Sequence, residues 1–271
     1  MIIYGSRMYF KKNLVNSFGR CQYCGSYSKQ RSYQAIKFGH IYFIPLIPLG
    51  SKSQVLNECR SCDMGAHIKM QDLDPMVDSL AERFKDWIIE IQDGNHEIEA
   101  GENGEKINGG ELIAGILEEL YCLKEIENVD SITTILDSNN MGYEKAMVMG
   151  RWHEIQGKLD EAKQEYESAH RIAPDRTLPL YQLGLAAVNS NDQVTAESAF
   201  SRYTKLEPED ASPWIELAGM YEGKKDWPNI IRTYDEIYTL APDVIPDKGM
   251  KKLYKKACKK SGQQGKFLAQ M

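Results

Sequence analysis

Long hydrophobic runs are missing from this sequence of 271 residues. The longest nearly apolar stretch, Ile41 to Gly50, spans ten residues and is interrupted by Pro45 and Pro48. A segment this short and broken cannot span a bilayer, so we expect no transmembrane segment. The first twelve residues also lack the apolar core and the small-residue cleavage site of a secretory signal. We therefore expect a cytoplasmic protein.

Recognisable catalytic motifs are missing as well. The sequence contains no Gly-x-Ser-x-Gly, no Walker phosphate loop and no Gly-rich dinucleotide turn. Histidine, the residue most often used for acid–base catalysis, occurs only five times and at scattered positions: His40, His67, His96, His153 and His170. These absences lead us to expect that the protein is not an enzyme.

The composition, 42% hydrophobic and 27% charged, is that of a foldable soluble protein, but the charge is divided along the chain. The formal net charge of −6 is the sum of +8 in residues 1–70, −14 in 71–142, −7 in 143–244 and +7 in 245–271. Blocks of opposite charge indicate modules with different surfaces. The length agrees, because it suits two or three small domains.

Four of the six cysteines form two pairs, Cys21/Cys24 and Cys59/Cys62, with 34 residues between the pairs. Each pair has Cys-x-x-Cys spacing, and Gly25 allows a sharp turn that brings backbone N–H groups to the sulfurs. Four thiolates suit a closed tetrahedral zinc site, which has a structural role because no coordination position is open. Between the pairs, residues 32–38, 40–46 and 54–58 have β-type sequence.

The first 65 or so residues resemble the zinc-ribbon family, particularly bacterial ribbons in which a segment like Phe43-Ile-Pro-Leu-Ile-Pro-Leu-Gly50 separates the cysteine pairs. The resemblance implies one structural zinc ion bound by Cys21, Cys24, Cys59 and Cys62. A redox-active dithiol is an alternative, but neither pair has the expected position at the start of a helix that follows a strand. Another alternative is a metal site in which His67 replaces one of the four cysteine ligands.

The acidic segment, residues 71–142, contains two apolar stripes with helical spacing. The first follows Asp74-Pro75, which is a good helix start, and runs from Val77 to Ile91. The second runs from Leu112 to Ile126. We expect two amphipathic helices that need a packing partner, joined by a Gly-rich, solvated loop at 93–110.

A repeat of 34 residues follows, marked by Pro174, Pro208 and Pro242. Each of the segments 143–176, 177–210 and 211–244 has two apolar-striped helical stretches separated by a polar turn and closes with proline.

This pattern resembles three tetratricopeptide repeats, for which a period of 34 is specific. Small residues at Gly150, Gly184 and Ala218 would let the two helices of each repeat approach closely. The sequence departs from the family pattern at His153, Ala187 and other positions without breaking it.

The resemblance also implies a concave groove lined by the first helix of each repeat. By the geometry of the family, the residues that face this groove are Met147, Arg151, Tyr181, Leu185, Val188, Ile215 and Glu222. An apolar groove with an arginine at one end suits an amphipathic helix or an extended apolar peptide of a partner. Alternatively, helices of the chain itself fill it.

Residues 245–260 are lysine-rich and predict a basic helix that caps the repeats, and residues 261–271 are expected to be disordered.

Together these observations predict a mainly α fold, a helical solenoid behind a small β-rich zinc ribbon. The expected function is a non-enzymatic scaffold that binds a protein or peptide in the groove. A nucleic-acid-associated protein, with the basic ribbon and the C-terminal lysines on phosphates, is the alternative. A third hypothesis, contact with a membrane surface, rests on Tyr42 to Leu49 and the lysine tail.

Overall fold

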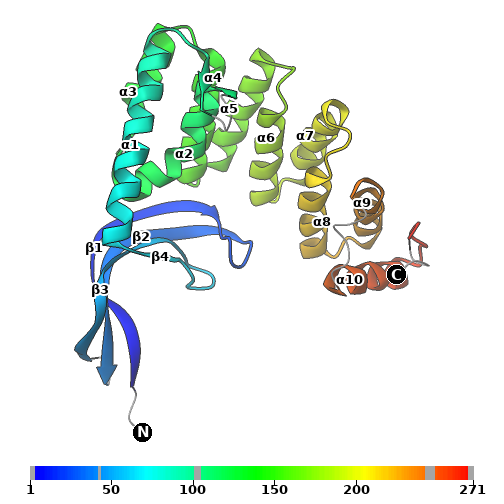
Figure 1. The fold of residues 1–271 in the computed structure, drawn as a ribbon. Coiled ribbons are helices and arrows are strands. Elements are labelled where there is room, and N and C mark those ends of the chain that lie inside the picture. The colour runs from blue at the N-terminus through cyan, green and yellow to red at the C-terminus, as the bar shows by residue number, and fades with distance from the viewer. Residues whose placement is uncertain (1–3, 42–43, 101–104, 242–247, 268–271) are drawn as a thin grey trace. The chain divides into compact units, whose positions relative to one another are not determined.

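The computed structural model describes residues 4–41, 44–100, 105–241 and 248–267. It confirms the predicted fold class, since an antiparallel sheet at the N-terminal side is followed by a mainly helical chain (Figure 1). The chain forms two compact units, Met1–Ala162 and Lys163–Met271. We call these unit 1 and unit 2 and describe each by itself.

The sheet of unit 1 has four antiparallel strands in the order β1-β2-β3-β4. Their bounds are Tyr4–Arg20, Tyr27–Ile41, Ile44–Cys59 and Ala66–Lys69. The short strand β4 pairs only with residues 53–56 of β3. Beyond that point β1, β2 and β3 continue as a three-stranded ribbon that extends away from α1–α4 in Figure 1.

The sequence did not predict β1, and the irregularity of that strand explains why. Its pairing with β2 shifts register twice, between Tyr9 and Lys12 and between Lys12 and Val15. Phe10 and Asn13 have positive φ values of 57° and 53° at these bulges. Because a bulge inserts an unpaired residue, it interrupts the alternation of apolar and polar residues by which a strand is recognised.

The acidic segment folds into α1 (Met70–Gln92), α2 (Gly109–Leu123) and α3 (Asp130–Ser138), which pack with α4 (Gly142–Ile155). The helix expected from Asp74-Pro75 begins earlier, at Met70, and buries Leu73 in the added turn. The predicted loop at 93–110 holds a small hairpin of β5 (Glu97–Glu99) and β6 (Lys106–Asn108). The apolar stripes meet in one core, which includes Trp87, Ile91, Ile113, Leu117, Leu136 and Val148.

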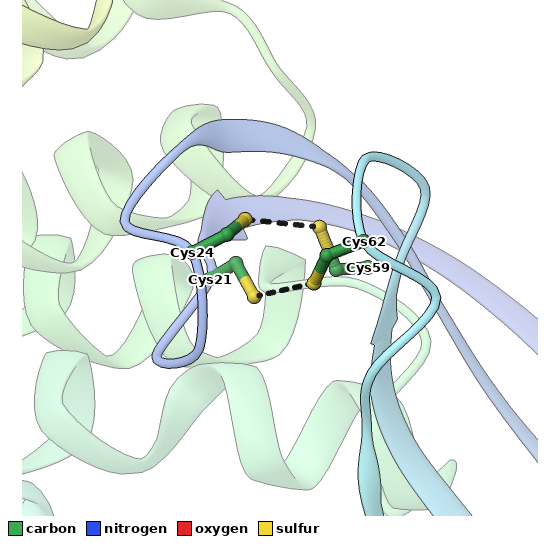
Figure 2. A group of neighbouring side chains, drawn as sticks. All are labelled: Cys21, Cys24, Cys59 and Cys62. Atoms are coloured by element: carbon green, nitrogen blue, oxygen red, sulfur yellow. Dashed lines mark hydrogen bonds between the residues drawn. The ribbon is translucent and has the colours of Figure 1, made fainter.

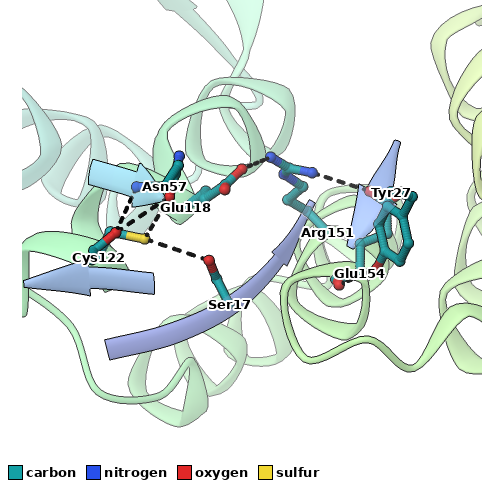
Figure 3. A network of polar contacts seen from close by, with 8 residues as sticks. Ser17, Tyr27, Asn57, Glu118, Cys122, Arg151 and Glu154 are labelled. Atoms are coloured by element: carbon teal, nitrogen blue, oxygen red, sulfur yellow. Dashed lines mark hydrogen bonds and ion pairs between the residues drawn. The ribbon is translucent and has the colours of Figure 1, made fainter. Parts of the chain in front are cut away.

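Polar contacts join the sheet to this helical core (Figure 3). The Tyr27 hydroxyl of β2 donates to the backbone carbonyl of Glu154 in α4, at 2.7 Å. Glu118 of α2 forms an ion pair with Arg151 of α4. The ring of Phe18 lies against Gly157, where a Cβ atom would be 2.9 Å from the ring. Unit 1 is therefore a single body in which the sheet is fixed to α2 and α4.

Helices of equal length recur at a fixed interval along the rest of the chain. Each has 14 residues, and successive ones begin 34 residues apart: α5 (Leu159–Ile172), α7 (Gln193–Leu206) and α9 (Trp227–Leu240). Between them lie α6 (Leu178–Asn189) and α8 (Ser212–Lys224). Within unit 2, α6 packs on α7 and α8 packs on α9.

The basic helix α10 (Lys248–Ser261) packs on α9 and buries Tyr254, Ala257 and Cys258 in the core of unit 2. After α10 the backbone N–H of Lys266 donates to Asp235 Oδ1 at 3.1 Å. The Phe267 ring stacks on Tyr238, with centroids 5.2 Å apart. Part of the segment that the sequence predicted as disordered thus makes defined contacts, whereas 268–271 lie outside the described residues.

The first prediction concerns the close approach of α6 and α7. A Cβ atom at Gly184 would clash with the Phe200 ring, whereas one at Gly219 in α8 meets nothing within 4 Å. Gly184→Ala is expected to lower the free energy of unfolding by about 1–2 kcal/mol, since overpacking outweighs the gain in helix propensity. Gly219→Ala, the matched control, should raise it by up to about 1 kcal/mol. Urea denaturation measures both, and equal effects would contradict the close approach.

The second prediction concerns Glu118. Burial raises the pKa of this carboxyl above its ordinary value of 4.5. The neighbouring Arg151 lowers the pKa, but offsets only part of that rise. Arg151→Met should therefore raise the pKa further. The folded state then holds a proton that the unfolded state has released, so stability should fall as the pH rises above 4.5.

Urea midpoints between pH 4.5 and 7 measure this slope, with Arg151→Met/Glu118→Gln as the control that removes the titrating group. The account is wrong if the single and double variants show the same pH dependence.

Candidate metal centre

The loop between β1 and β2 forms a tight knuckle around the first cysteine pair. The backbone N–H of Cys21 donates to the carbonyl of Ser26 at 3.0 Å, and the N–H of Gly25 donates to the carbonyl of Cys21 at 2.8 Å. The N–H of Tyr23 points at Cys21 Sγ from 3.4 Å. Gly25 has a φ of +71°, which most residues avoid and glycine adopts without strain. The turn predicted from Gly25 is therefore present.

The loop between β3 and β4 repeats this geometry around the second pair. The N–H of Cys59 donates to the carbonyl of Met64 at 2.8 Å, and the N–H of Asp63 donates to the carbonyl of Cys59 at 2.9 Å. The N–H of Ser61 points at Cys59 Sγ from 3.3 Å. Asp63 takes the place of Gly25, with a φ of +57°. Asp is one of the few residues with a side chain that adopts this conformation readily, so aligning the two knuckles would have identified it.

The two knuckles bring all four predicted sulfurs into one cluster (Figure 2). Cys21 Sγ lies 3.7 Å from Cys62 Sγ, and Cys24 Sγ lies 3.8 Å from Cys59 Sγ. All four sulfurs are within 4.8 Å of one another. Thiolates at about 2.3 Å around a tetrahedral ion would be separated by about 3.8 Å, so the cluster has the size needed to hold one metal ion.

Two serine hydroxyls complete the surroundings of the sulfurs. Ser28 Oγ is 3.2 Å from Cys59 Sγ, and Ser26 Oγ is 2.9 Å from Cys24 Sγ. Sequence reasoning did not identify these serines. Such outer contacts orient metal ligands and tune their charge. Ser28 also links the two knuckles, because it is the second residue of β2 and contacts Cys59, the last residue of β3.

The protonation of the cysteines shows why a cation fits here. Burial raises the pKa of Cys59, but hydrogen bonds from Ser28 and from the N–H groups of Ser61 and Cys62 outweigh it and lower the pKa to about 6. At Cys62 the N–H of Met64 lowers the pKa, whereas burial and hydrogen bonds to the other three sulfurs raise it, to about 12 overall. The cluster thus retains a proton at neutral pH until a cation replaces it.

The alternatives left open by the sequence find no support in this geometry. His67 lies exposed on β4, opposite Val55, and does not belong to the cluster. The first cysteine pair lies in the loop between β1 and β2, and the second lies at the end of β3 and in the loop that follows, so neither pair is at the start of a helix. Among the residues that the structure describes, the four cysteines are the one group of potential ligands with metal-binding geometry.

The two remaining cysteines are buried. Cys122 in α2 is 2% exposed and donates to Asn57 Oδ1 of β3 at 3.3 Å, and burial raises the pKa of this thiol. Cys258 in α10 is 6% exposed. Both side chains are buried, and neither belongs to the metal-binding cluster.

The residues predicted to line a groove differ in accessibility between the two units. In unit 1, Met147 is 1% exposed, and Arg151 pairs with Glu118 of α2 and with Glu154 at 3.4 Å. In unit 2, side chains on α6 and α8 are partly or fully exposed: Tyr181, Leu185 and Val188 on α6, and Ile215 and Glu222 on α8. The accessible positions are therefore those of unit 2.

Comparison with models of protein families and with curated proteins finds no match. No helix in the described parts of the chain is long and apolar enough to cross a membrane.

The third prediction is that the purified chain binds one divalent metal ion and that this binding strengthens with pH. Because Cys62 must lose its proton, affinity should rise by about tenfold per pH unit for each proton displaced. Cobalt(II) titration, followed by the absorption of tetrahedral cobalt thiolates, measures the affinity between pH 6 and 8.

Cys62→Ser should abolish this absorption, and Cys258→Ala is the control that should retain it. A site that binds cobalt equally well at all pH values, or without Cys62, would contradict the four-thiolate cluster.

Proposed function

We propose that this chain is a non-enzymatic scaffold. One structural zinc ion holds the N-terminal sheet, and a helical array of the tetratricopeptide type binds a segment of a partner protein. The observation that carries the proposal is the recurrence of α5, α7 and α9, equal in length and 34 residues apart.

Zinc is favoured by the donor set. Four cysteine sulfurs in a tetrahedral cluster are typical of structural zinc, and the ion would leave no open position for a substrate. It would join the β1–β2 loop to the β3–β4 loop and so tie together two segments that are far apart in sequence. Its role in this proposal is therefore to stabilise the sheet.

The details of the helical pairs support the tetratricopeptide assignment. Asp192 and Asp226 stand 34 residues apart, and each caps the following helix by accepting a backbone N–H three residues on, at 3.2 Å and 3.4 Å. Gly184, the small residue expected where two helices approach, lies against Phe200 of the next helix. Matching caps and matching close contacts at one period indicate repeated units.

The partner-binding face in this proposal is the exposed side of α6 and α8. Leu185 and Val188 are partly buried against the core of unit 2, and Ile215 is 41% exposed. These apolar side chains suit an amphipathic helix or an extended apolar peptide.

The arrangement inside unit 1 supports a helix as the occupant. The corresponding position on α4, Arg151, is covered by α2, whose Glu118 pairs with it. The amphipathic helix α2 packs on α4 and buries Ile113 and Leu117. In unit 1, a helix of the chain itself therefore covers the groove-facing side of α4. By analogy, the exposed side of α6 and α8 would bind a helix of a partner protein.

The fourth prediction tests this face. Val188→Asp/Ile215→Asp places two carboxylates on α6 and α8, and Val194→Asp is the matched control because Val194 on α7 is 79% exposed. Proteins from the source cell that are captured by the immobilised chain after nuclease treatment should be lost with the double variant and kept with the control.

Circular dichroism confirms that both variants retain their helices. If nuclease removes all captured material, or if the double variant captures the same proteins as the control, the scaffold proposal fails. Capture that depends on nucleic acid would instead favour the alternative function, in which the basic N-terminal module binds nucleic acid.

A further inference from the structure

The segment that follows α10 contacts α9 and α10 in the way that a bound peptide would. We call this segment, residues 262–267, the latch. The backbone N–H of Lys266 donates to Asp235 Oδ1 at 3.1 Å, and the N–H of Phe267 donates to the Tyr254 hydroxyl at 3.3 Å. Two successive N–H groups that belong to no helix or strand are thus bound by side chains of α9 and α10. Main-chain hydrogen bonds of this kind give peptide-binding sites their affinity.

The side chains that bind the latch are fixed inside unit 2. Asp235 is 8% exposed, and Tyr254 is fully buried. The Tyr254 hydroxyl also donates to Asp235 Oδ1, and the Tyr254 ring packs edge-on against Tyr234 and Tyr238. Burying a carboxylate is costly unless it is hydrogen-bonded, and the latch supplies one of these hydrogen bonds. The latch therefore occupies a site with a buried polar centre, which surface side chains alone do not provide.

Two features of this site select the residues that it accepts. A Cβ atom at Gly265 would lie 1.8 Å from the Tyr254 hydroxyl oxygen, so glycine is required at this position. The Phe267 ring stacks on Tyr238, with centroids 5.2 Å apart and 26° between the ring planes. Lys266, which lies between these two positions, is exposed. The site therefore selects a glycine followed two residues later by an aromatic residue.

The contacts of the latch are few enough for it to open. Its connection to α10, Gly262 to Gln264, is exposed. Beyond the turn that ends α10, the described contacts are two hydrogen bonds, one pair of stacked rings and the approach of Gly265 to Tyr254. Segments with few buried apolar contacts open locally more often than a packed core does. An open latch leaves the Asp235 carboxylate and the Tyr238 ring available to another segment.

We propose that α9 and α10 form a second peptide-binding site, distinct from the exposed side of α6 and α8, and that the latch occupies it in competition with a segment of a partner protein. That segment carries a glycine two residues before an aromatic residue, as the latch does at Gly265 and Phe267. The latch is then an autoinhibitory contact. Its short connection to α10 gives it an effective concentration on the order of millimolar, so a partner must displace it in order to bind.

The fifth prediction is that opening the latch exposes the site to an added peptide. The probe is a fluorescein-labelled, amidated peptide with the sequence of residues 261–267, and fluorescence anisotropy measures its binding to the full chain. Gly265→Ala in the chain should open the latch through the clash with Tyr254, without backbone strain, because the φ of Gly265 is not in the left-handed region. This variant should bind the peptide about tenfold more tightly than the wild type, in which the latch competes.

Matched variants separate this effect from a general disturbance of unit 2. Gln264→Ala changes the exposed neighbour of Gly265 and should bind the peptide as weakly as the wild type does. Phe267→Ala weakens the latch without introducing a clash and should also tighten binding. Tyr238→Leu, added to Gly265→Ala, removes the stacking partner and should reduce binding by about fivefold. Circular dichroism confirms that each variant retains its helices.

The selectivity of the site is tested with a second peptide that carries Gly265→Ala, which should not bind the Gly265→Ala chain. The proposal is overturned if the wild type and the Gly265→Ala chain bind the first peptide equally, or if the two peptides bind alike. Absence of binding at about millimolar chain concentration also overturns it, because so weak a site would not hold the latch closed. A wild-type dimer that Phe267→Ala dissociates contradicts it as well, since the latch would then bind a second copy.

Discussion

The constraint on which unit 1 depends is the approach of four cysteine sulfurs to less than 5 Å. Among the described residues, the buried apolar cluster of the sheet itself is small and consists of Tyr33, Ala35 and Val55, so the cysteine cluster is a large part of what can hold its loops together. Burial and hydrogen bonds to the other three sulfurs raise the pKa of Cys62, so that thiol keeps its proton until a divalent cation displaces it. The free energy of binding a metal ion here would therefore add to the stability of the folded sheet.

The sheet in turn fixes what lies on either side of it. At one end, Tyr27 and Phe18 hold it to α4 and to the turn that follows, so the metal-binding module and the first helices form one body. At the other end β1, β2 and β3 continue as the three-stranded ribbon, on which Phe10 and Leu49 are exposed. A metal ion at the cysteine cluster would therefore stabilise the same sheet that Tyr27 and Phe18 attach to the helices of unit 1.

The sequence predicted those parts of the structure that depend on local spacing. The cysteine pairs and the period of 34 are fixed by a few residues at set intervals, and the sulfur cluster and the helix spacing agree with them. The strand β1 was missed because bulges at Phe10 and Asn13 break its alternation. The covering of Arg151 by Glu118 depends on tertiary packing between segments 33 residues apart, which no local pattern reports.

Hydrogen exchange followed by mass spectrometry, with and without removal of the metal by a chelator, tests most directly whether the ion holds the sheet. The account predicts that removal exposes the amides of β1–β4 to rapid exchange and leaves those of α6–α9 protected. Unchanged protection of the sheet after the metal has been removed would contradict it, because the sheet would then be stable without the ion.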